Sequence, residues 1–273
     1  MVQVKGVKIG SGMPKICVPI TGGSQDEILT QAQNIPKEYV DIVEWRSDYF
    51  EQGEEQEKVV ETAGLLQSIL GELPLLFTCR TAREGGQLSL SFPKYEKLLQ
   101  VVADSGYADL IDVEAFRGYD TRISPKREWR VTDACNEKVR DLVEYLSKRV
   151  VVIGSYHDFE KTPSREEILR RLLFMDRMGV DIPKMAVMPQ EREDVICLME
   201  ANSLADRLIV EKPVITMAMG RLGAVSRLSG ETFGSAVTFG CMEQSSAPGQ
   251  IPVEQLRYIL EALHGEEDTD CEL

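Results

Sequence analysis

Short runs of apolar residues alternate along this chain with longer segments of helical period. The runs are rich in branched side chains and nearly continuous, which is typical of parallel strands buried on both faces of a sheet. Each run is followed by a segment long enough to form a helix, so the pattern predicts repeated βα units. There are eight such runs, at residues 15–20, 41–46, 75–80, 109–116, 150–156, 184–188, 214–219 and 235–240.

Capping residues mark the expected starts of several intervening helices. Ser24 is followed three positions later by Glu27, and Ser164 by Glu167, which is the spacing of a capping box. Pro252 stands where the last helical segment begins, a position that proline favours. These signals support one helix after each predicted strand.

A single (β/α)₈ barrel is the α/β architecture that these elements predict, and 273 residues is an ordinary length for it. A doubly wound open sheet is the alternative. Such a sheet usually has a glycine-rich dinucleotide-binding turn after its first strand, and residues 20–24 are too short for one. Residues 2–9, which alternate around Gly6, are expected to form a small hairpin outside the barrel.

No linker divides the chain, so we expect residues 1–273 to form one catalytic domain. Residues 118–133 are polar and irregular, and we expect a long loop after the fourth strand. The last residues, 266–273, form an acidic tail that we expect to be solvated.

Charge and cysteine content narrow the class of protein. The net charge of −14 and pI near 4.8 argue against a nucleic-acid or anionic-membrane partner, since both attract basic surfaces. No apolar run approaches the roughly 20 residues of a membrane span, and no secretory signal is evident at the N-terminus. The six cysteines form no CxxC pair or zinc pattern, which favours reduced thiols, no metal site and a cytoplasmic location.

Charged residues follow several predicted strands at the end where barrels place their functional groups. The second strand ends with Glu44 and Arg46, and Arg80 and Glu84 follow the third. Structural explanations are available for both pairs. Glu44 and Arg46 lie two positions apart and could pair inside the barrel, and Arg80 and Glu84 could form an ion pair within a loop.

Two further residues suggest carbonyl chemistry. His157 ends the fifth apolar run, and Lys184 opens the sixth. A lysine on a buried strand is costly unless it is paired or used, and an amine near an imidazole supplies a nucleophile and a proton carrier. Lys184 opens its run where a catalytic residue would be expected to close one, so its position alone does not select it. Arg227 alone is most simply explained as part of a solvated helix face.

An ordered series of motifs resembles the type I, Schiff-base-forming 3-dehydroquinate dehydratases over nearly the whole chain. The matching segments are residues 44–46, 77–86, 157–159, 161–163, 183–189, 226–228, 233–235, 238–240 and 246–252. The resemblance implies a (β/α)₈ barrel, usually dimeric, that uses no metal or organic cofactor. It also implies dehydration of the small molecule 3-dehydroquinate in the shikimate route to aromatic amino acids.

The resemblance also implies a role for each site residue. Lys184 would form an imine with the substrate ketone, His157 would act as general acid and base, and Glu84 would orient His157. Arg227 would bind the substrate carboxylate. The other implied substrate contacts are Glu44, Arg46, Arg80, Met217, Ser246 and Gln250.

Two other functions share parts of this pattern. A class I aldolase or transaldolase would also use a barrel and a Schiff-base lysine, and would bind a sugar phosphate near Arg227 and residues 245–250. A non-catalytic carboxylate-binding barrel would keep the pocket but would need neither Lys184 nor His157. Glu44, Arg46 and Arg80 together suit a polyhydroxylated carboxylate better than a sugar phosphate.

Overall fold

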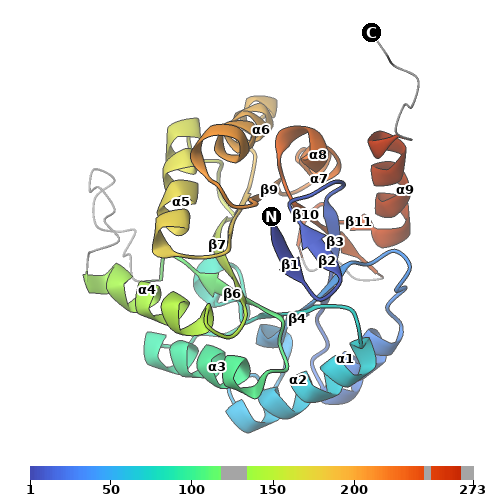
Figure 1. Ribbon diagram of the computed structural model, residues 1–273, viewed down its shortest axis with the longest axis vertical. Helices are drawn as coiled ribbons and strands as arrows, with labels where there is room; N and C mark the ends of the chain where they lie inside the picture. Colours follow the sequence, from blue (N-terminus) through green and yellow to red (C-terminus); the bar gives the residue numbers. More distant parts are fainter. Residues whose placement is uncertain (118–133, 243–246, 266–273) are drawn as a thin grey trace.

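Eight parallel strands form a barrel in the computed structural model, which describes residues 1–117, 134–242 and 247–265 (Figure 1). Their order in the sheet follows the chain, and β10 pairs with β3 to complete the circle, with a single bridge from Val214 to Ser235 between β9 and β10. The predicted (β/α)₈ barrel is therefore confirmed. The barrel strands are β3 (Lys15–Ile20), β4 (Ile42–Arg46), β5 (Leu75–Thr78), β6 (Leu110–Glu114), β7 (Val151–Asp158), β8 (Ile182–Val187), β9 (Ile215–Ala218) and β10 (Val237–Cys241).

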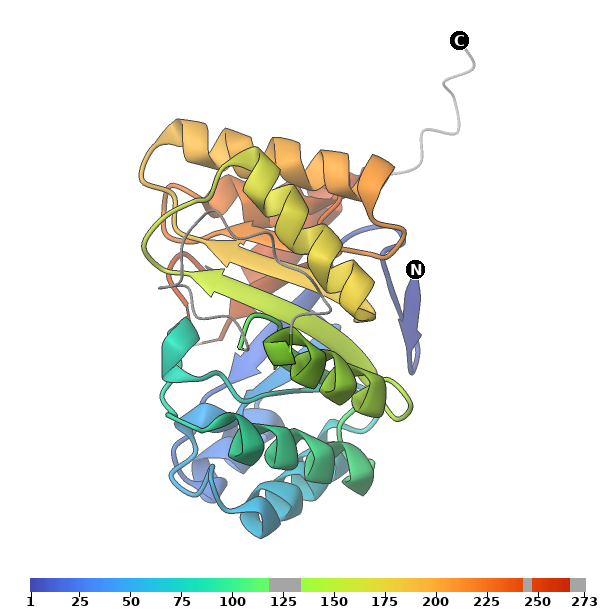
Figure 2. The ribbon, with the colours of Figure 1, turned by 90° about the vertical axis from the view of Figure 1, so that its left-hand side faces the viewer.

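Helices surround the barrel, as Figures 1 and 2 show. They are α1 (Gln25–Gln33), α2 (Gln56–Leu70), α3 (Phe92–Ser105), α4 (Ala134–Leu146), α5 (Arg165–Met178), α6 (Arg192–Leu204), α7 (Ala224–Leu228), α8 (Gly230–Phe233) and α9 (Val253–His264). A short strand, β11 (Ile251–Pro252), pairs with β10 just before α9. No described helix is long and apolar enough to span a membrane. The expected loop at 118–133 and the tail at 266–273 lie outside the described residues.

The predicted helix starts are largely confirmed. Ser24 and Glu27 form a complete capping box at α1. Ser164 caps α5 by accepting the backbone N–H of Glu167. The Glu167 carboxylate instead pairs with Arg171 at 2.9 Å, one turn further along the helix.

One strand begins earlier than expected. The sequence analysis placed the sixth strand at residues 184–188, with Lys184 as its first residue. The structure extends β8 back to Ile182 and keeps Pro183 within it, paired in register with Gly154. Lys184 is therefore the third residue of its strand.

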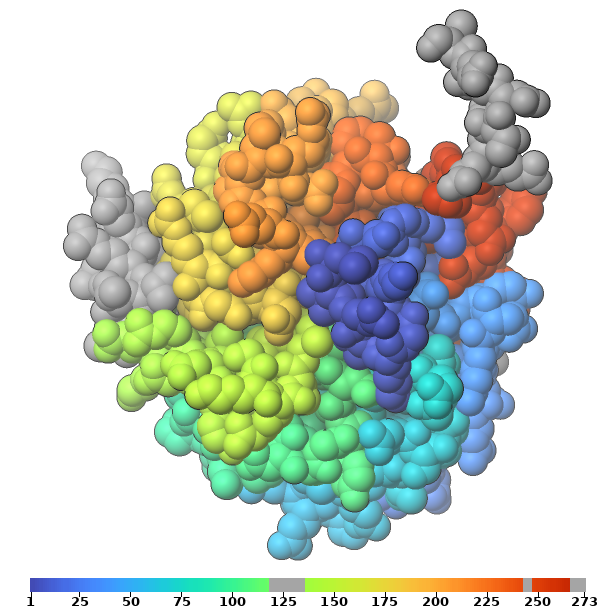
Figure 3. All heavy atoms as spheres, in the orientation of Figure 1, coloured from blue at the N-terminus to red at the C-terminus, as the bar shows by residue number. Residues whose placement is uncertain are grey.

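The expected N-terminal hairpin closes one end of the barrel. β1 (Val2–Val4) and β2 (Val7–Ile9) pair in antiparallel register, and Figure 3 shows them over the centre of one face. Val4 and Ile9 are buried against the apolar side chains at the start of the barrel strands. In Figure 2 the strand arrows point away from this hairpin, so the carboxyl ends lie at the opposite end.

Aspartates at the amino end repeat one hydrogen bond around the barrel. Asp41, Asp109 and Asp181 each stand immediately before a strand and accept a backbone N–H from the preceding strand at 2.8 Å. The donors are Ile16, Leu75 and Val152, respectively. Each carboxylate satisfies a backbone donor at a strand start, so these residues stabilise the fold.

Inward-facing side chains change from apolar to polar along the barrel. Because successive side chains of a strand alternate between its faces, every second residue points inward. The first inward positions are apolar, at Ile42, Leu76, Leu110, Ile153, Ile182 and Ile215. Two residues further along the same strands stand Glu44, Thr78, Asp112, Ser155, Lys184 and Met217. The following inward positions are Arg46, Arg80, Glu114, His157, Ala186 and Met219.

Candidate active site

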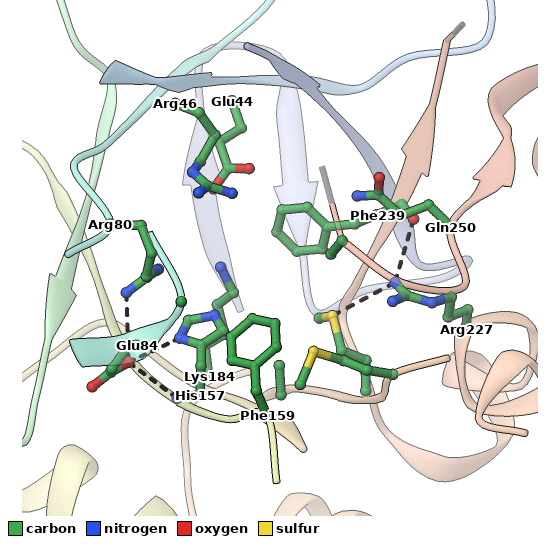
Figure 4. Close-up of a pocket in the computed structure, with 15 residues that line it drawn as sticks. Glu44, Arg46, Arg80, Glu84, His157, Phe159, Lys184, Arg227, Phe239 and Gln250 are labelled. Atoms are coloured by element: carbon green, nitrogen blue, oxygen red, sulfur yellow. Dashed lines mark hydrogen bonds and ion pairs between the residues drawn. The ribbon is translucent and has the colours of Figure 1, made fainter. Parts of the chain in front are cut away.

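A pocket at the carboxyl end of the barrel collects most of the predicted site residues (Figure 4). Strands β4, β7 and β8 and the segment after β5 supply its charged side, whereas β9 and β10 contribute apolar side chains. Ser246 lies outside the described residues. The lining residues are Glu44, Arg46, Arg80, Glu84, Gly85, His157, Phe159, Lys184, Ala186, Met217, Met219, Arg227, Phe239, Ala247 and Gln250.

Lys184 lies deep in this pocket and is only 4% exposed. Its Nζ donates to Asp112 Oδ2 at 3.2 Å and lies 4.6 Å from the centre of the Phe239 ring. Its strand neighbour β7 places Ser155 directly beside it in register. The second inward position of β8 therefore carries this amine to the pocket floor, which explains how a residue near a strand start reaches the site.

His157, on β7, is held by Glu84, which follows β5. Glu84 ends the short 3₁₀ helix η2 (Ala82–Glu84), which follows β5. Its Oε2 accepts the backbone N–H of His157 at 3.0 Å and lies 2.9 Å from Nδ1 of the same residue. Since that oxygen already acts as an acceptor, Nδ1 is the N–H donor, and Nε2 keeps its lone pair for the pocket.

The charge state of this pair follows from its surroundings. Burial, together with the positive charges of Arg80 and Lys184, holds the pKa of His157 well below its usual value. The imidazole is therefore neutral at neutral pH. Burial and the nearby charge of Glu114 raise the pKa of Glu84 well above its usual value.

Arg80 lies between the carboxylate that contacts Lys184 and the carboxylate that contacts His157. Its guanidinium lies 2.8 Å from Asp112, 3.6 Å from Glu84 and 3.5 Å from Glu114, and donates to Ser155 Oγ at 2.9 Å. The buried guanidinium is therefore paired with buried carboxylates, and the role that these contacts support most directly for Arg80 is charge balance. Arg80 also links the carboxylate beside Lys184 to the carboxylate beside His157.

Arg46 and Glu44 lie on β4, and each has its own partner. Arg46 forms a two-pronged ion pair with Asp48, from Nε to Oδ1 at 2.7 Å and from Nη2 to Oδ2 at 2.8 Å. Asp48 also accepts the backbone N–H of Arg80 at 3.2 Å, so it ties the end of β4 to the end of β5. Glu44 accepts a hydrogen bond from Thr78 Oγ1 at 2.8 Å. Glu44 and Arg46 therefore do not hold each other in place: each is held by a different partner.

Arg227 differs from the other cations of the pocket because no carboxylate of the described residues forms an ion pair with it. It lies on α7 and is 1% exposed, so a solvated helix face was the wrong explanation. Its hydrogen-bond partners among the described residues are neutral: Met217 Sδ at 3.7 Å, the Phe239 carbonyl at 3.5 Å and the Pro248 carbonyl at 3.1 Å. Its Nε has no hydrogen-bond partner there. Burial lowers its pKa to about 10.

Arg227 is therefore a candidate anion-binding residue. A buried charge without a counter-ion is unfavourable, and an anionic ligand would relieve that cost. A guanidinium also offers the forked donors that suit a carboxylate or phosphate. Figure 4 shows Arg227 across the pocket from His157 and Lys184, so an anion bound there would belong to a molecule that extends toward the amine.

Apolar side chains complete the pocket near its opening. Phe159 is 40% exposed and lies over Gly85, whose φ of +80° belongs to the left-handed region. A Cβ on Gly85 would meet the Phe159 ring at 2.3 Å, so glycine is required for this contact. Met217 lines the pocket with its Sδ 3.7 Å from Arg227, and Gln250, just before β11, also lines it.

Sequence reasoning missed four polar residues that support the site. Asp48, Asp112, Glu114 and Ser155 are all buried and contact predicted site residues. A signal for two of them was present. Asp112 and Glu114 are carboxylates two positions apart within a predicted buried strand, the same spacing that drew attention to Glu44 and Arg46.

No group of three or more histidine, cysteine or acidic side chains able to hold a metal ion occurs among the described residues. The four cysteines that the structure describes as free thiols are Cys17, Cys79, Cys197 and Cys241.

The fold and the pocket together define a (β/α)₈-barrel enzyme with a buried amine, a neutral imidazole and a buried arginine that is a candidate anion site. The family model for type I 3-dehydroquinase matches residues 16–267, and the chain belongs to this family. The 3-dehydroquinate dehydratase of Clostridioides difficile strain 630 is 42% identical over 96% of this chain and 97% of its own. That of Bacillus subtilis strain 168 is also 42% identical, over 97% of both chains.

Solved structures agree with this assignment. The type I 3-dehydroquinate dehydratase of Clostridium difficile, solved with covalent modified comenic acid, matches with a TM-score of 0.87 at 42% identity. The match covers 96% of this chain and 97% of that one. The 3-dehydroquinate dehydratase of Geobacillus kaustophilus matches with a TM-score of 0.85 at 39% identity, over 96% and 95% of the two chains.

Proposed function

We propose that this protein dehydrates 3-dehydroquinate to 3-dehydroshikimate through a Schiff base at Lys184. The observation that carries the proposal is the pocket in which a buried amine and the His157–Glu84 pair face an unneutralised arginine, in a chain of the type I family. The reaction is a carbon–oxygen lyase step in the shikimate route to aromatic amino acids. It needs no metal or organic cofactor.

Lys184 is the proposed nucleophile. Its nitrogen lone pair attacks the C3 ketone of the substrate, and loss of the carbonyl oxygen as water leaves an iminium. This cation withdraws electrons from the adjacent carbon, so the C2 proton becomes acidic enough to remove. The covalent ligand in the Clostridium difficile relative is consistent with a nucleophile in a site of this kind.

His157 is the proposed general acid and base. Its neutral ring, with Nε2 free of the Glu84 contact, has the form needed to accept the C2 proton. The resulting imidazolium then protonates the departing C1 hydroxyl, which leaves as water. Glu84 supports that imidazolium through the 2.9 Å contact with Nδ1. A water molecule then adds to C3 of the product iminium, and departure of the Lys184 amine restores the ketone and the free enzyme.

Arg227 is the proposed partner of the substrate carboxylate. Its burial without a counter-ion favours an anion of one negative charge, which suits a carboxylate. Glu44 and Arg46 are proposed to contact ring hydroxyls, and Arg80 to balance charge beside them. Met217 supplies an apolar wall, and Ser246 and Gln250 are proposed to close over the substrate.

The remaining expectations extend this proposal to the whole chain. We propose that residues 1–273 act as one catalytic domain with a solvated tail at 266–273, in a cytoplasmic homodimer. The family resemblance and the acidic, reduced-thiol composition support these points. Sedimentation of the purified protein tests the dimer directly, since a monomer at micromolar concentration would contradict it.

The function is tested by following the ultraviolet absorbance of the conjugated enone product after adding 3-dehydroquinate. We expect enzyme-dependent growth of this absorbance, which stops at equilibrium. A sugar phosphate offered under the same conditions should be neither cleaved nor bound. Aldol cleavage of that compound without enone formation would contradict the dehydratase assignment and favour the aldolase.

A further inference from the structure

Asp112 contacts the reacting amine but has no role in the steps described above. Its Oδ2 accepts from Lys184 Nζ at 3.2 Å. Its Oδ1 accepts from Ser155 Oγ at 2.6 Å and lies 2.8 Å from Arg80 Nη2. The carboxylate is 1% exposed, and both of its oxygens therefore contact protein donors rather than solvent.

We propose that Asp112 is the counter-ion of the iminium at Lys184, and that it remains ionised throughout the reaction. This inference rests on the proposed function, because it concerns the intermediate of that reaction. Asp112 would hold the amine at the pocket floor before attack. After attack it would keep the imine protonated, and the protonated form is the one that withdraws electrons.

The positive charge of the iminium lies at the nitrogen of Lys184. The Lys184 amine and the ketone combine with one proton to give the iminium and one water. The amine lone pair forms the new carbon–nitrogen bond, and the carbonyl pair leaves with oxygen. The nitrogen keeps one hydrogen and a positive charge, and that N–H can donate to the same Asp112 oxygen that now contacts Nζ.

The surroundings of Asp112 suit a fixed negative charge and not a proton carrier. Burial alone would raise its pKa, but the charges of Arg80 and Lys184, with the Ser155 hydroxyl, hold the pKa of Asp112 below its usual value. A carboxylate held by three donors does not readily accept a proton. Proton transfer therefore belongs to His157, and charge balance to Asp112.

The Asp112→Asn variant gives this inference a distinctive consequence. A carboxylate within about 4–6 Å typically shifts the pKa of a partner by roughly 1–3 units. Without it, the imine should lose its proton at a pH lower by about that amount, so the alkaline limb of kcat moves to lower pH. Less protonated imine should also accumulate during turnover.

A matched control is available immediately before the same strand. Asp109, just before β6, also pairs with a lysine, since its Oδ2 lies 3.0 Å from Lys5 Nζ at the opposite end of the barrel. Asp109→Asn removes the same charge three positions away but does not touch the pocket. It should lower the melting temperature and leave the pH profile and the adduct unchanged.

The experiment measures pH profiles of kcat together with the fraction of protein trapped by borohydride during turnover, for wild type and both variants. We expect the Asp112→Asn adduct fraction to fall at least about tenfold at alkaline pH, with the alkaline limb shifted down by roughly 1–3 units. An unshifted limb with wild-type trapping would overturn the counter-ion assignment. Absence of any wild-type adduct would instead remove the proposed function on which it rests.

Asp112→Glu keeps the test decisive if Asp112→Asn does not fold. Glutamate retains the charge but displaces it, so kcat should fall while the alkaline limb stays near its wild-type pH. A limb shifted by one unit or more in a folded Asp112→Glu variant would contradict the assignment, because the charge is still present.

Discussion

Two aspartates, Asp109 just before strand β6 and Asp112 within it, each pair with a lysine at opposite ends of the barrel, and the two pairs have different surroundings. Asp109 and Lys5 lie 3.0 Å apart at the amino end, and Asp112 and Lys184 lie 3.2 Å apart at the carboxyl end. The Lys5 amine also donates to two backbone carbonyls, and its side chain is 22% exposed. The Lys184 side chain is 5% exposed and has one anionic partner and an aromatic ring.

Other charged residues at the two ends of the barrel differ in the same way, in how completely their partners satisfy them. At the amino end, Asp41, Asp109 and Asp181 each satisfy a backbone N–H, and the hairpin covers the apolar side chains beneath them. At the carboxyl end, Lys184 depends on one carboxylate and Arg227 on none among the described residues. The same residue types therefore stabilise the fold where their partners are complete and offer chemistry where they are not.

Replacing Lys184 should have the largest effect on turnover. Lys184→Ala removes the nucleophile, so we expect kcat to fall by on the order of 10⁴-fold or more. Lys5→Ala is the matched control, and it should cost about 1 kcal/mol of stability while turnover stays near wild type. Enone formation by Lys184→Ala at the wild-type rate would mean that the incomplete pair is not where the chemistry occurs.

The next largest effect concerns His157. His157→Ala should lower kcat by roughly 10²–10⁴-fold, the usual contribution of general acid–base catalysis. Because the pKa of His157 lies well below its usual value, the base stays unprotonated as pH falls through the ordinary imidazole range. The acidic limb of kcat/KM in the wild type should therefore lie below about pH 6.5. An acidic limb above that value that disappears in His157→Ala would contradict the burial argument.

Arg227 should affect binding more than catalysis. Arg227→Met removes the charged donors for the substrate carboxylate, so KM should rise by roughly 10- to 100-fold with a smaller change in kcat. It also removes an unneutralised buried charge, so the ligand-free variant should melt about 2–4 °C higher than wild type. Differential scanning calorimetry without ligand measures this, and a clear fall in melting temperature would show that Arg227 is balanced in the free protein.

The smallest effect on activity is expected at the amino end. Asp181→Ala leaves the Val152 N–H without its partner at 2.8 Å, which should cost about 1–2 kcal/mol of unfolding free energy. Turnover should remain within about twofold of wild type at 25 °C. Urea unfolding and the enone assay together check this, and a tenfold loss of kcat without loss of stability would place the amino end in the mechanism.

The sequence predicted the barrel well because its strands are marked by local composition. All eight apolar runs correspond to observed strands, since parallel strands buried on both faces need nearly continuous apolar residues. The start of β8 was misjudged because the strand was placed at residues 184–188, whereas pairing with β7 extends it back to Ile182. The hairpin was expected, but its burial over the barrel end depends on Val4 and Ile9 contacting residues far along the chain.

The site was less completely predictable. The family resemblance named Lys184, His157 and Glu84, but the partners that surround them come from three-dimensional proximity. Lys184 meets Asp112 across 72 positions, and that distance along the chain leaves no local signal. Arg227 was expected to be solvated and is buried, because a helical segment of mixed polar and apolar residues does not reveal which of its side chains turns inward.

Locating the borohydride-trapped adduct tests the central claim most directly. The protein is incubated with 3-dehydroquinate, reduced, digested and mapped by mass spectrometry, with Lys5 serving as an internal comparison. The account predicts one substrate-derived adduct per chain, on the peptide that contains Lys184, and none on Lys5. Product formation with no adduct, or an adduct on another lysine, would contradict the claim that the incompletely paired lysine at the carboxyl end carries the reaction.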